Sequence, residues 1–351
     1  MSSVIENYLD SLPDDTTSIN LSYRGLTYVP DLSRFKNLKS LDCKFNRLTS
    51  LPPFNETLQH VNCTYNMLTS LPELNKNLQE LYCTHNQLTS LPELNENLRQ
   101  LYCSVNQLTC LPELNENLQE LYCAKNRLTL IPPLNRNIRT LYCCFNQLTG
   151  LPPFSERLET LFCADNQLTG LPELNENLKI LFCSNNRLTI LPKLNENLEE
   201  LNCCYNQLTG LPVLTQNLIL LNCSNNQLTC LPKLNETLQR LYCSNNQIYT
   251  IRSWDHINLC ELYYGQNPLF EILSDDIDND RVSYDNLLSV QMKIQVLNQF
   301  RYLYYGLRLK KKFTKWLWKS REPNIQQKYH PSYLMANLTA EDELEEFLEN
   351  W

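Results

Sequence analysis

Apolar and polar residues follow one another along this chain in a unit of twenty residues. The unit reads LPELNKNLQELYCTHNQLTS in one copy and recurs without insertion over residues 51–250. In that copy, Leu81 and Cys83 flank Tyr82, a pattern typical of a short strand with one buried face. One such strand cannot bury its apolar face alone. The repeat therefore predicts a solenoid whose strands stack about 4.8 Å apart in one continuous parallel sheet.

Cysteine and asparagine each occupy a fixed position in the unit. Eleven of the sixteen cysteines recur every twenty residues, and they are Cys43, Cys63, Cys83, Cys103, Cys123, Cys143, Cys163, Cys183, Cys203, Cys223 and Cys243. We expect these thiols to be buried as small apolar side chains. An asparagine follows each of them three residues later, from Asn46 to Asn246. We expect these amides to form a ladder that satisfies the backbone groups left unpaired by the turn after each strand.

The complete pattern resembles a known repeat family. Its L-x-x-L-x-C-x-x-N-x-L spacing, formed by Leu78, Leu81, Cys83, Asn86 and Leu88, resembles the leucine-rich repeat, with Cys in a slot that Leu usually holds. The twenty-residue length, with LTSLPEL between units, resembles secreted effectors of enterobacterial pathogens. The cysteine column and the tail sequence REPNIQQKYHPSYL also resemble repeat proteins of giant amoeba-infecting DNA viruses. This resemblance implies an α/β-type, mostly β, curved solenoid with the parallel sheet on its concave face.

The regular units and their flanks divide the chain into three parts. Less regular units extend the series at both ends, so we expect about thirteen repeats over 18–270, preceded by an N-terminal cap at 1–17. The return segment LPELNENL is short and carries Pro in nearly every copy, which predicts an extended, polyproline-like convex side. Residues 271–351 are expected to form a C-terminal helical segment with an acidic tail.

The C-terminal segment carries a basic amphipathic pattern. Apolar residues recur there at spacings of three and four, and they are Leu287, Val290, Ile294, Leu297, Phe300, Tyr304 and Leu307. The stretch 293–321 contains nine basic residues and no acidic residue. We interpret it as a helical cap on the open end of the solenoid. Two alternatives remain: the helix contacts an anionic membrane or nucleic acid, aided by Trp316 and Trp318, or it binds a partner.

Composition excludes several classes of protein. Only 6 of 351 residues are Gly and no Gly-rich phosphate loop occurs, which argues against nucleotide-binding enzymes. The net charge of −8 gives no support for nucleic-acid binding over the whole surface. We find no transmembrane segment and no signal peptide in the sequence. We therefore expect a cytoplasmic or host-cell intracellular protein whose cysteines are thiols.

No catalytic constellation emerges from the sequence. The four histidines form no spaced pair, and stacked thiols do not converge on a metal ion, so we expect no enzymatic activity, cofactor or metal. Some enterobacterial repeat effectors carry a ubiquitin-ligase domain with a catalytic Cys. Here Cys260 is the last cysteine, so that activity is not carried over. Cys144 and Cys204 fall on outward strand positions, where we expect them to be solvent-accessible.

The outward strand positions provide the candidate binding residues. One column of the sheet is predicted to present the aromatic residues Tyr82, Tyr102, Tyr122, Tyr142, Phe162, Phe182, Tyr242 and Tyr263, interrupted by Asn202 and Asn222. A neighbouring column supplies several glutamates. The aromatic column either stabilises the sheet through cross-strand pairs or forms a binding surface for an unknown protein partner. The glutamates make a nucleic-acid ligand on this face unfavourable. The oligomeric state is left open.

Overall fold

The computed structural model describes residues 2–251, 259–268, 281–282 and 307–312. The chain divides into two units, Met1–Met292 and Lys293–Trp351, which are described separately. The first unit contains the repeats. In the second, residues 307–312 are helical with exposed side chains, and they lie inside the predicted basic segment. The remainder of the predicted C-terminal helix and the acidic tail lies outside the described residues.

The first unit is a solenoid built on one sheet of fourteen strands, in which all strands except the last pair in parallel. Each strand of the series pairs with the strand of the following repeat, in register, so that Leu81 lies opposite Leu101. The strands are β1 (Ser18–Asn20), β2 (Ser40–Asp42), β3 (His60–Asn62), β4 (Glu80–Tyr82), β5 (Gln100–Tyr102), β6 (Glu120–Tyr122), β7 (Thr140–Tyr142), β8 (Thr160–Phe162), β9 (Ile180–Phe182), β10 (Glu200–Asn202), β11 (Leu220–Asn222), β13 (Arg240–Tyr242), β15 (Glu261–Tyr263) and the antiparallel β16 (Arg281–Val282). The predicted parallel sheet is confirmed.

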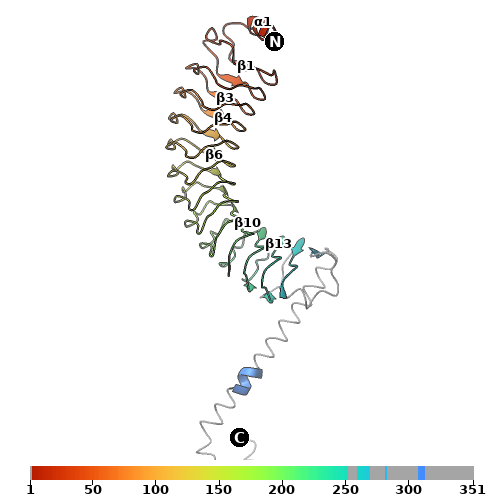
Figure 1. Ribbon diagram of the computed structural model, residues 1–351. Helices are drawn as coiled ribbons and strands as arrows, with labels where there is room; N and C mark the ends of the chain where they lie inside the picture. The colour runs from red at the N-terminus through yellow and green to blue at the C-terminus, as the bar shows by residue number, and fades with distance from the viewer. Residues whose placement is uncertain (1, 252–258, 269–280, 283–306, 313–351) are drawn as a thin grey trace, which may run out of the picture. The chain divides into compact units, whose positions relative to one another are not determined.

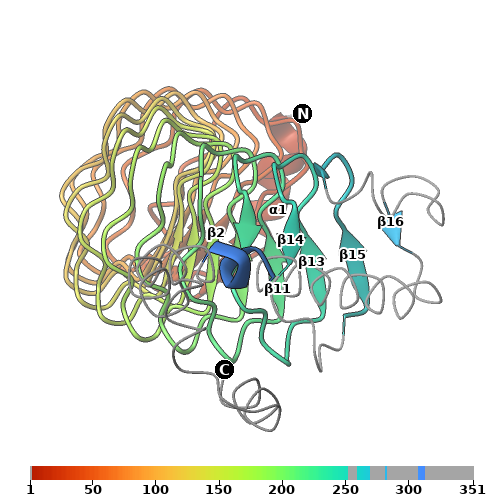
Figure 2. The same ribbon diagram turned by 90° about the horizontal axis from the view of Figure 1, so that it is seen from below.

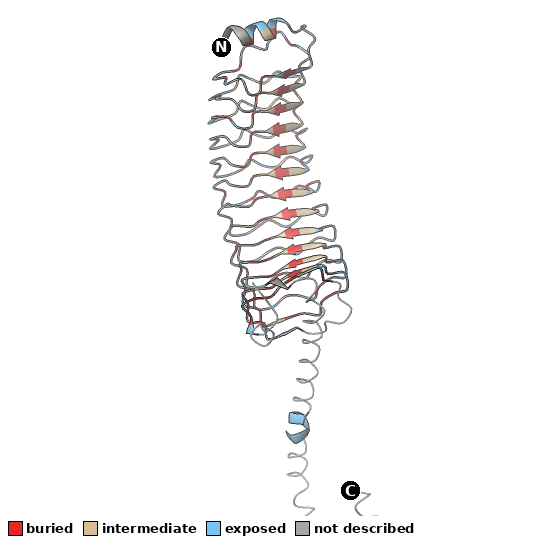
Figure 3. Cartoon of the chain, turned by 90° about the vertical axis from the view of Figure 1, so that its right-hand side faces the viewer, coloured by how far each residue is buried: buried red, intermediate tan, exposed pale blue. Residues whose placement is uncertain are grey.

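The stack of repeats is curved, and the sheet lies on the inner side of the curve. Figure 1 shows the turns of chain bending around the strands, and Figure 3 shows the ladder of strands from that inner side. Viewed along the stack, the turns overlie one another (Figure 2). The return segments of the regular repeats, such as 72–75, contain neither helix nor strand. A small second sheet pairs β12 (Cys230–Leu231) with β14 (Thr250–Ile251).

The core consists of the same few positions in every repeat. In one repeat these are Leu78, Leu81, Cys83 and Leu88, all with no exposed area. The middle residue of each strand from β2 to β11 is buried while its two neighbours are half-buried. The inward orientation predicted for the leucine and cysteine positions is therefore confirmed. A column of fully buried thiols runs beside the buried leucines.

The predicted asparagine ladder is also confirmed. Asn86 Oδ1 accepts a hydrogen bond from the Leu68 N–H at 3.0 Å, in the preceding repeat. Asn86 Nδ2 donates to the carbonyl oxygens of Cys63 and Cys83, each at 3.0 Å. One side chain therefore satisfies backbone groups of two consecutive repeats and ties them together.

A second asparagine ladder, which the sequence analysis missed, lies on the return segments. Asn75 Nδ2 donates to the Asn55 carbonyl oxygen at 2.9 Å, and its Oδ1 accepts from the Asn77 N–H at 2.8 Å. Asn77 Nδ2 donates to the Glu56 carbonyl oxygen at 2.7 Å. The N-x-N motif, which six of the ten regular return segments carry between 75–77 and 195–197, was the signal for this ladder.

The turn after each strand contains a left-handed residue that is not glycine. In the regular repeats it immediately precedes the ladder asparagine, with φ between 51° and 56°, as at His85, Val105 and Lys125. A non-glycine residue in this conformation costs roughly 1–2 kcal/mol. The low glycine content therefore coexists with a backbone that needs one left-handed residue per turn.

A helix precedes the first strand of the solenoid. Helix α1 (Ser2–Asp10) buries Ile5 and Leu9. Arg34 donates to the carbonyl oxygens of Leu9 and Leu12 and pairs with Asp14 at 3.3 Å. These contacts join residues 2–14 to the first units of the series.

Candidate protein-binding surface

The aromatic residues predicted for one column of the sheet lie in two stacks, which we call the aromatic row. The longer stack runs from β4 to β9, with ring centroids 4.2 to 4.7 Å apart. The shorter stack pairs Tyr242 with Tyr263 at 5.0 Å. All of these side chains are half-buried. The structure therefore brings the eight candidate residues together on the inner face, with their ring faces largely covered by one another.

Three hydroxyl groups of the row are hydrogen-bonded to the neighbouring column, which consists of the first residue of each strand. Tyr82 Oη donates to Gln100 Oε1 at 2.8 Å, and Tyr102 Oη donates to Glu120 Oε2 at 2.6 Å. Tyr242 Oη donates to Glu261. Each bond crosses from one repeat to the next, so the two columns hold each other in place.

Burial and nearby carboxylates keep these phenols protonated. Burial, with the charge of Glu80, raises the pKa of Tyr82 to about 12. Burial and the bond to Glu261 raise the pKa of Tyr242 to about 12. Burial and the bond to Glu120 raise the pKa of Tyr102 well above its usual range. The row therefore presents neutral hydroxyl groups at every physiological pH.

The neighbouring column carries a net negative charge. It contains four glutamates, Glu80, Glu120, Glu200 and Glu261. His60 Nδ1 lies 3.1 Å from a Glu80 oxygen, and Arg240 lies 3.8 Å from a Glu200 oxygen. These groups only partly offset the carboxylates. The inner face thus combines aromatic edges with negative charge.

Small side chains fill the outward position that follows each ladder cysteine from Cys63 to Cys243. They are Thr64, Thr84, Ser104, Ala124, Cys144, Ala164, Ser184, Cys204, Ser224 and Ser244. The prediction that Cys204 is solvent-accessible is wrong: it is buried, with 9% of its surface exposed, and its side chain hydrogen-bonds with Ser184 of the neighbouring repeat. Cys144 is half-buried, and burial raises its pKa to about 11. The exposed cysteines are Cys110 and Cys260.

The ladder thiols are protonated and inaccessible. All sixteen cysteines are free, and the eleven ladder cysteines have no exposed area. Burial raises the pKa of Cys43 to about 12, and the other ladder thiols shift in the same direction for the same reason. Among the residues that the structure describes, no group of His, Cys, Asp or Glu could hold a metal ion. These thiols are packing groups rather than nucleophiles.

A second aromatic stack, which the sequence analysis did not single out, lies on the left-handed turn residues. It joins Tyr23, Phe45, Tyr65 and His85, with ring centroids 4.0 to 4.5 Å apart. The sequence could have predicted this stack, because Phe45, Tyr65 and His85 each immediately precede a ladder asparagine. The stack ends at His85 because the next turn residue is Val105, and the aromatic turn residues Phe145 and Tyr205 have no aromatic residue at the adjacent turns.

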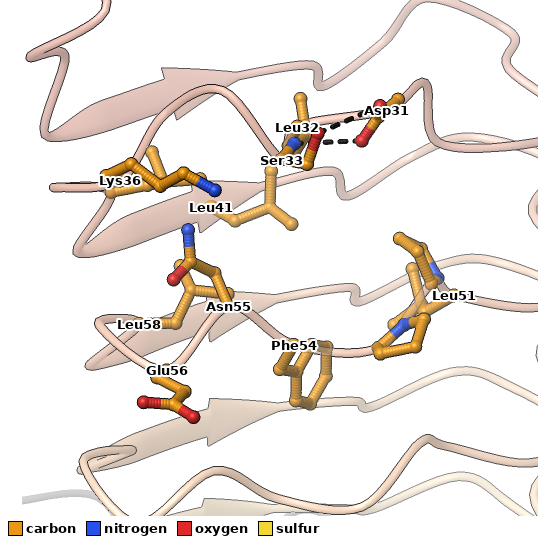
Figure 4. Close-up of a pocket in the computed structure, with 13 residues that line it drawn as sticks. Asp31, Leu32, Ser33, Lys36, Leu41, Leu51, Phe54, Asn55, Glu56 and Leu58 are labelled. Atoms are coloured by element: carbon orange, nitrogen blue, oxygen red, sulfur yellow. Dashed lines mark hydrogen bonds between the residues drawn. The ribbon is translucent and has the colours of Figure 1, made fainter.

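One cavity of about 420 Å³ lies between the return segments of two N-terminal repeats. Leu51, Phe54 and Leu58 line it on one side, and Asp31 and Lys36 on the other (Figure 4). The Asp31 carboxylate accepts hydrogen bonds from the Ser33 N–H and hydroxyl, at 2.8 and 2.9 Å. The cavity is a mostly apolar recess, and its Asp31 carboxylate is already engaged by Ser33.

The twenty-residue turns, the inner parallel sheet and the asparagine ladder together define a leucine-rich repeat solenoid. A family model described as "Leucine Rich repeats (2 copies)" matches residues 76–116. The chain is a leucine-rich repeat protein, and its twenty-residue repeats resemble those of bacterial effectors. Such domains are typically protein–protein interaction modules, and such scaffolds are generally not enzymes.

Three solved structures illustrate the similarity. YopM from Yersinia enterocolitica WA-314 is 30% identical, over 71% of this chain and 60% of that chain, with a TM-score of 0.67. The leucine-rich repeat protein LIC12759 of Leptospira interrogans is 26% identical, over 78% and 98% of the two chains, with a TM-score of 0.52. The functional domain of InlJ from Listeria monocytogenes, which includes a cysteine ladder, is 24% identical over 71% of this chain and 67% of that chain, with a TM-score of 0.49.

The extent of these matches is limited. The chain spans about 60% of the length of the YopM structure. No curated protein matches it. Among the helices that the structure describes, none is long and apolar enough to cross a bilayer.

Proposed function

We propose that this chain is a non-enzymatic interaction module that binds a protein partner on the aromatic row of its inner face. The observation that carries the proposal is the alignment of Tyr82, Tyr102, Tyr122 and Tyr142 in one half-buried stack on the face that curves inward. Tyrosine provides a large contact area with little side-chain entropy to lose, and it is enriched at the centres of protein interfaces.

The chemistry of this face favours a protein over a nucleic acid. Single-stranded nucleic acids need exposed ring faces for stacking and basic groups for their phosphates. In the longer stack each inner ring is covered by its neighbours, and Glu80, Glu120 and Glu200 provide negative charge beside it. The accessible features are ring edges and carboxylates, which suit a protein partner with apolar and basic side chains.

A pull-down from the native cell tests the proposal. The variant Tyr102→Ala/Tyr122→Ala/Tyr142→Ala removes the centre of the row. The control Tyr28→Ala/Tyr205→Ala/Tyr249→Ala removes three tyrosines that are 52–59% exposed and lie outside it. We expect the first variant to lose partners that wild type and control retain, while all three proteins remain folded by circular dichroism. Identical partner lists for wild type and the row variant would contradict the proposal.

The basic C-terminal segment supports a second candidate function, an adaptor or anchor that uses the repeats as a scaffold. Lys310, Lys311 and Lys312 are exposed within the described helical residues 307–312. Such a cluster attracts anionic lipid surfaces and RNA. The charge reversal Lys310→Glu/Lys311→Glu/Lys312→Glu should abolish binding to phosphatidylserine vesicles or RNA. If the full chain binds neither probe before the substitution, this second function is wrong.

We propose that the chain functions in a reducing, intracellular compartment. The sixteen free cysteines support this location, since disulfides are rare there. Mass spectrometry after alkylation in intact cells should find every ladder cysteine reduced. Disulfide-linked ladder peptides would contradict the proposal.

A further inference from the structure

The aromatic row contains a gap two repeats wide. Phe182 on β9 and Tyr242 on β13 are separated by β10 and β11, which carry Asn202 and Asn222 in the aromatic position. At the edge of this gap, Phe182 is tilted by 54° to Phe162, whereas the other stacked pairs of the row lie within 26°. Within the described residues, Phe182 has a stacked neighbour on one side only. The side toward Asn202 lacks a ring.

The two asparagines lie low in the gap because each folds back on its own strand. Asn202 Oδ1 accepts from the Cys204 N–H at 3.3 Å, and Asn222 Oδ1 accepts from the Ser224 N–H at 3.2 Å. Each oxygen is thereby engaged, and no hydrogen bond from either Nδ2 to another described residue is formed. Both side chains are half-buried, so the floor of the gap presents two amide donors that a ligand can reach.

The adjacent column changes in the same repeats. Its members on β4 to β8 are polar, but β9 and β11 begin with Ile180 and Leu220, with Glu200 between them. Both apolar residues are half-buried, and 33% of the Glu200 side chain is exposed. Arg240 pairs with Glu200 at 3.8 Å, which leaves room for a closer cation. Two columns thus depart from the repeat pattern at one place, and together they surround the gap.

We propose that this gap, formed by Phe182, Asn202, Asn222 and Tyr242, is the specificity-determining subsite of the inner face. It takes one aromatic side chain from an extended basic segment of a protein partner. The aromatic ring packs on the open side of Phe182 and against Leu220, in the place that a repeat tyrosine would fill. The asparagine amides donate to peptide carbonyl oxygens of the segment, and a lysine or arginine beside the aromatic residue pairs with Glu200.

The charge of the surface defines the occupant. Glu80, Glu120, Glu200 and Glu261 give the face negative charge, with Arg240 as a partial counter-charge. An acidic segment would be repelled by these glutamates, whereas a basic segment is complementary to them. This inference rests on the proposed function, since it specifies which side chains a partner on the inner face must provide.

The test uses the full chain and a phage-displayed library of random decapeptides as the probe. We expect enriched peptides to share an aromatic residue flanked by lysine or arginine. Their fluorescein-labelled forms are then measured by fluorescence anisotropy. The variant Asn202→Tyr/Asn222→Tyr fills the gap with the residue that most other repeats carry, so it should fold and should bind these peptides about tenfold more weakly. An enriched motif that lacks an aromatic or a basic residue would overturn the proposal.

A matched control separates the gap from a general effect of added tyrosines. Asn185→Tyr/Asn245→Tyr makes the same two changes at exposed turn positions, whose equivalents elsewhere are already Tyr65 and Tyr205. This control should bind the peptides as wild type does. Glu200→Gln should weaken the binding of peptides that contain the basic residue. It should leave unchanged the binding of peptides in which glutamine replaces that basic residue. Equal losses of affinity for both kinds of peptide would show that Glu200 does not pair with a basic residue of the partner, and would contradict the subsite.

The two proposals fail in distinguishable ways. If the Tyr102→Ala/Tyr122→Ala/Tyr142→Ala variant no longer binds the peptides while the gap-filled variant still binds them, the proposed inner-face function is supported and the proposed subsite is wrong. If both variants bind as tightly as wild type, both proposals are wrong. Loss in the gap-filled variant alone, with the control unchanged, supports the subsite.

Discussion

Asn166 Nδ2 donates a hydrogen bond of 3.0 Å to the carbonyl oxygen of Cys143, a residue of the preceding repeat. The same amide donates to the Cys163 carbonyl oxygen at 3.2 Å, and its Oδ1 accepts from the Leu148 N–H at 3.0 Å. The side chain therefore replaces backbone partners that the turn cannot provide, in every repeat of the series. Solenoid cohesion depends on such bonds between neighbouring repeats as well as on apolar burial.

The substitution Asn166→Leu should destabilise the chain by at least about 1–3 kcal/mol, because the Leu148 N–H and two carbonyl groups lose their partner. Urea denaturation measures the change. Gln147→Leu, at an exposed position one residue after the ladder Asn146, is the control and should have a smaller effect. Equal losses for the two variants would contradict the assignment of the ladder.

The neighbouring thiol should tolerate a change of chemistry if its volume is kept. Cys163 is fully buried, and burial raises its pKa well above the usual range. Cys163→Val retains an apolar group of similar size on a strand edge and should cost less than about 1.5 kcal/mol. Cys163→Asp would bury an unpaired carboxyl group and should prevent folding at ordinary temperature. Unfolding by the valine variant would show that the thiol itself is required.

The cysteines should react with iodoacetamide in an order set by exposure. Cys110 and Cys260 are exposed and should be modified first, Cys144 slowly, and the ladder thiols only after unfolding. Because burial raises the pKa of Cys144 to about 11, its rate should rise about tenfold for each unit of pH below that value. Peptide mass spectrometry measures each site. Modification of ladder cysteines in the native chain would contradict the structure.

Part of this architecture could be predicted from the sequence because it depends on period alone. The spacing of Leu81, Cys83 and Asn86 determines which side chains point inward once strands stack in register. Burial of Cys204 could not be predicted in this way, since Cys144 occupies the same position of the unit and is only half-buried, so the difference depends on local packing and not on the period. The bond from Tyr102 to Glu120 likewise depends on side-chain rotamers across two repeats, which no single unit specifies.

Alkaline titration should distinguish the row tyrosines from the rest. The folded-state pKa of Tyr82 and Tyr242 is raised to about 12, above the ordinary value near 10 for an unfolded chain. Their contribution to stability is complete below pH 10 and is lost as the pH rises from 10 through 12. Absorbance at 295 nm should show a late-titrating group of phenols that shrinks in Tyr82→Phe/Tyr242→Phe. Titration of all tyrosines together near pH 10 would contradict the hydrogen-bonded row.

The left-handed turn residues offer a way to stabilise the solenoid. Val105 adopts φ of 55°, a conformation that is unfavourable for a β-branched side chain. Val105→Gly removes that strain, roughly 1–2 kcal/mol, while the greater freedom of glycine in the unfolded chain costs about 0.4–1 kcal/mol. The net result should be a gain of up to about 1.6 kcal/mol, measured as a higher midpoint in urea. Asn245→Gly should gain less, because asparagine already tolerates the left-handed region. A loss of stability at Val105 larger than that at Asn245 would show that the valine side chain packs against its neighbours strongly enough to outweigh its strained backbone.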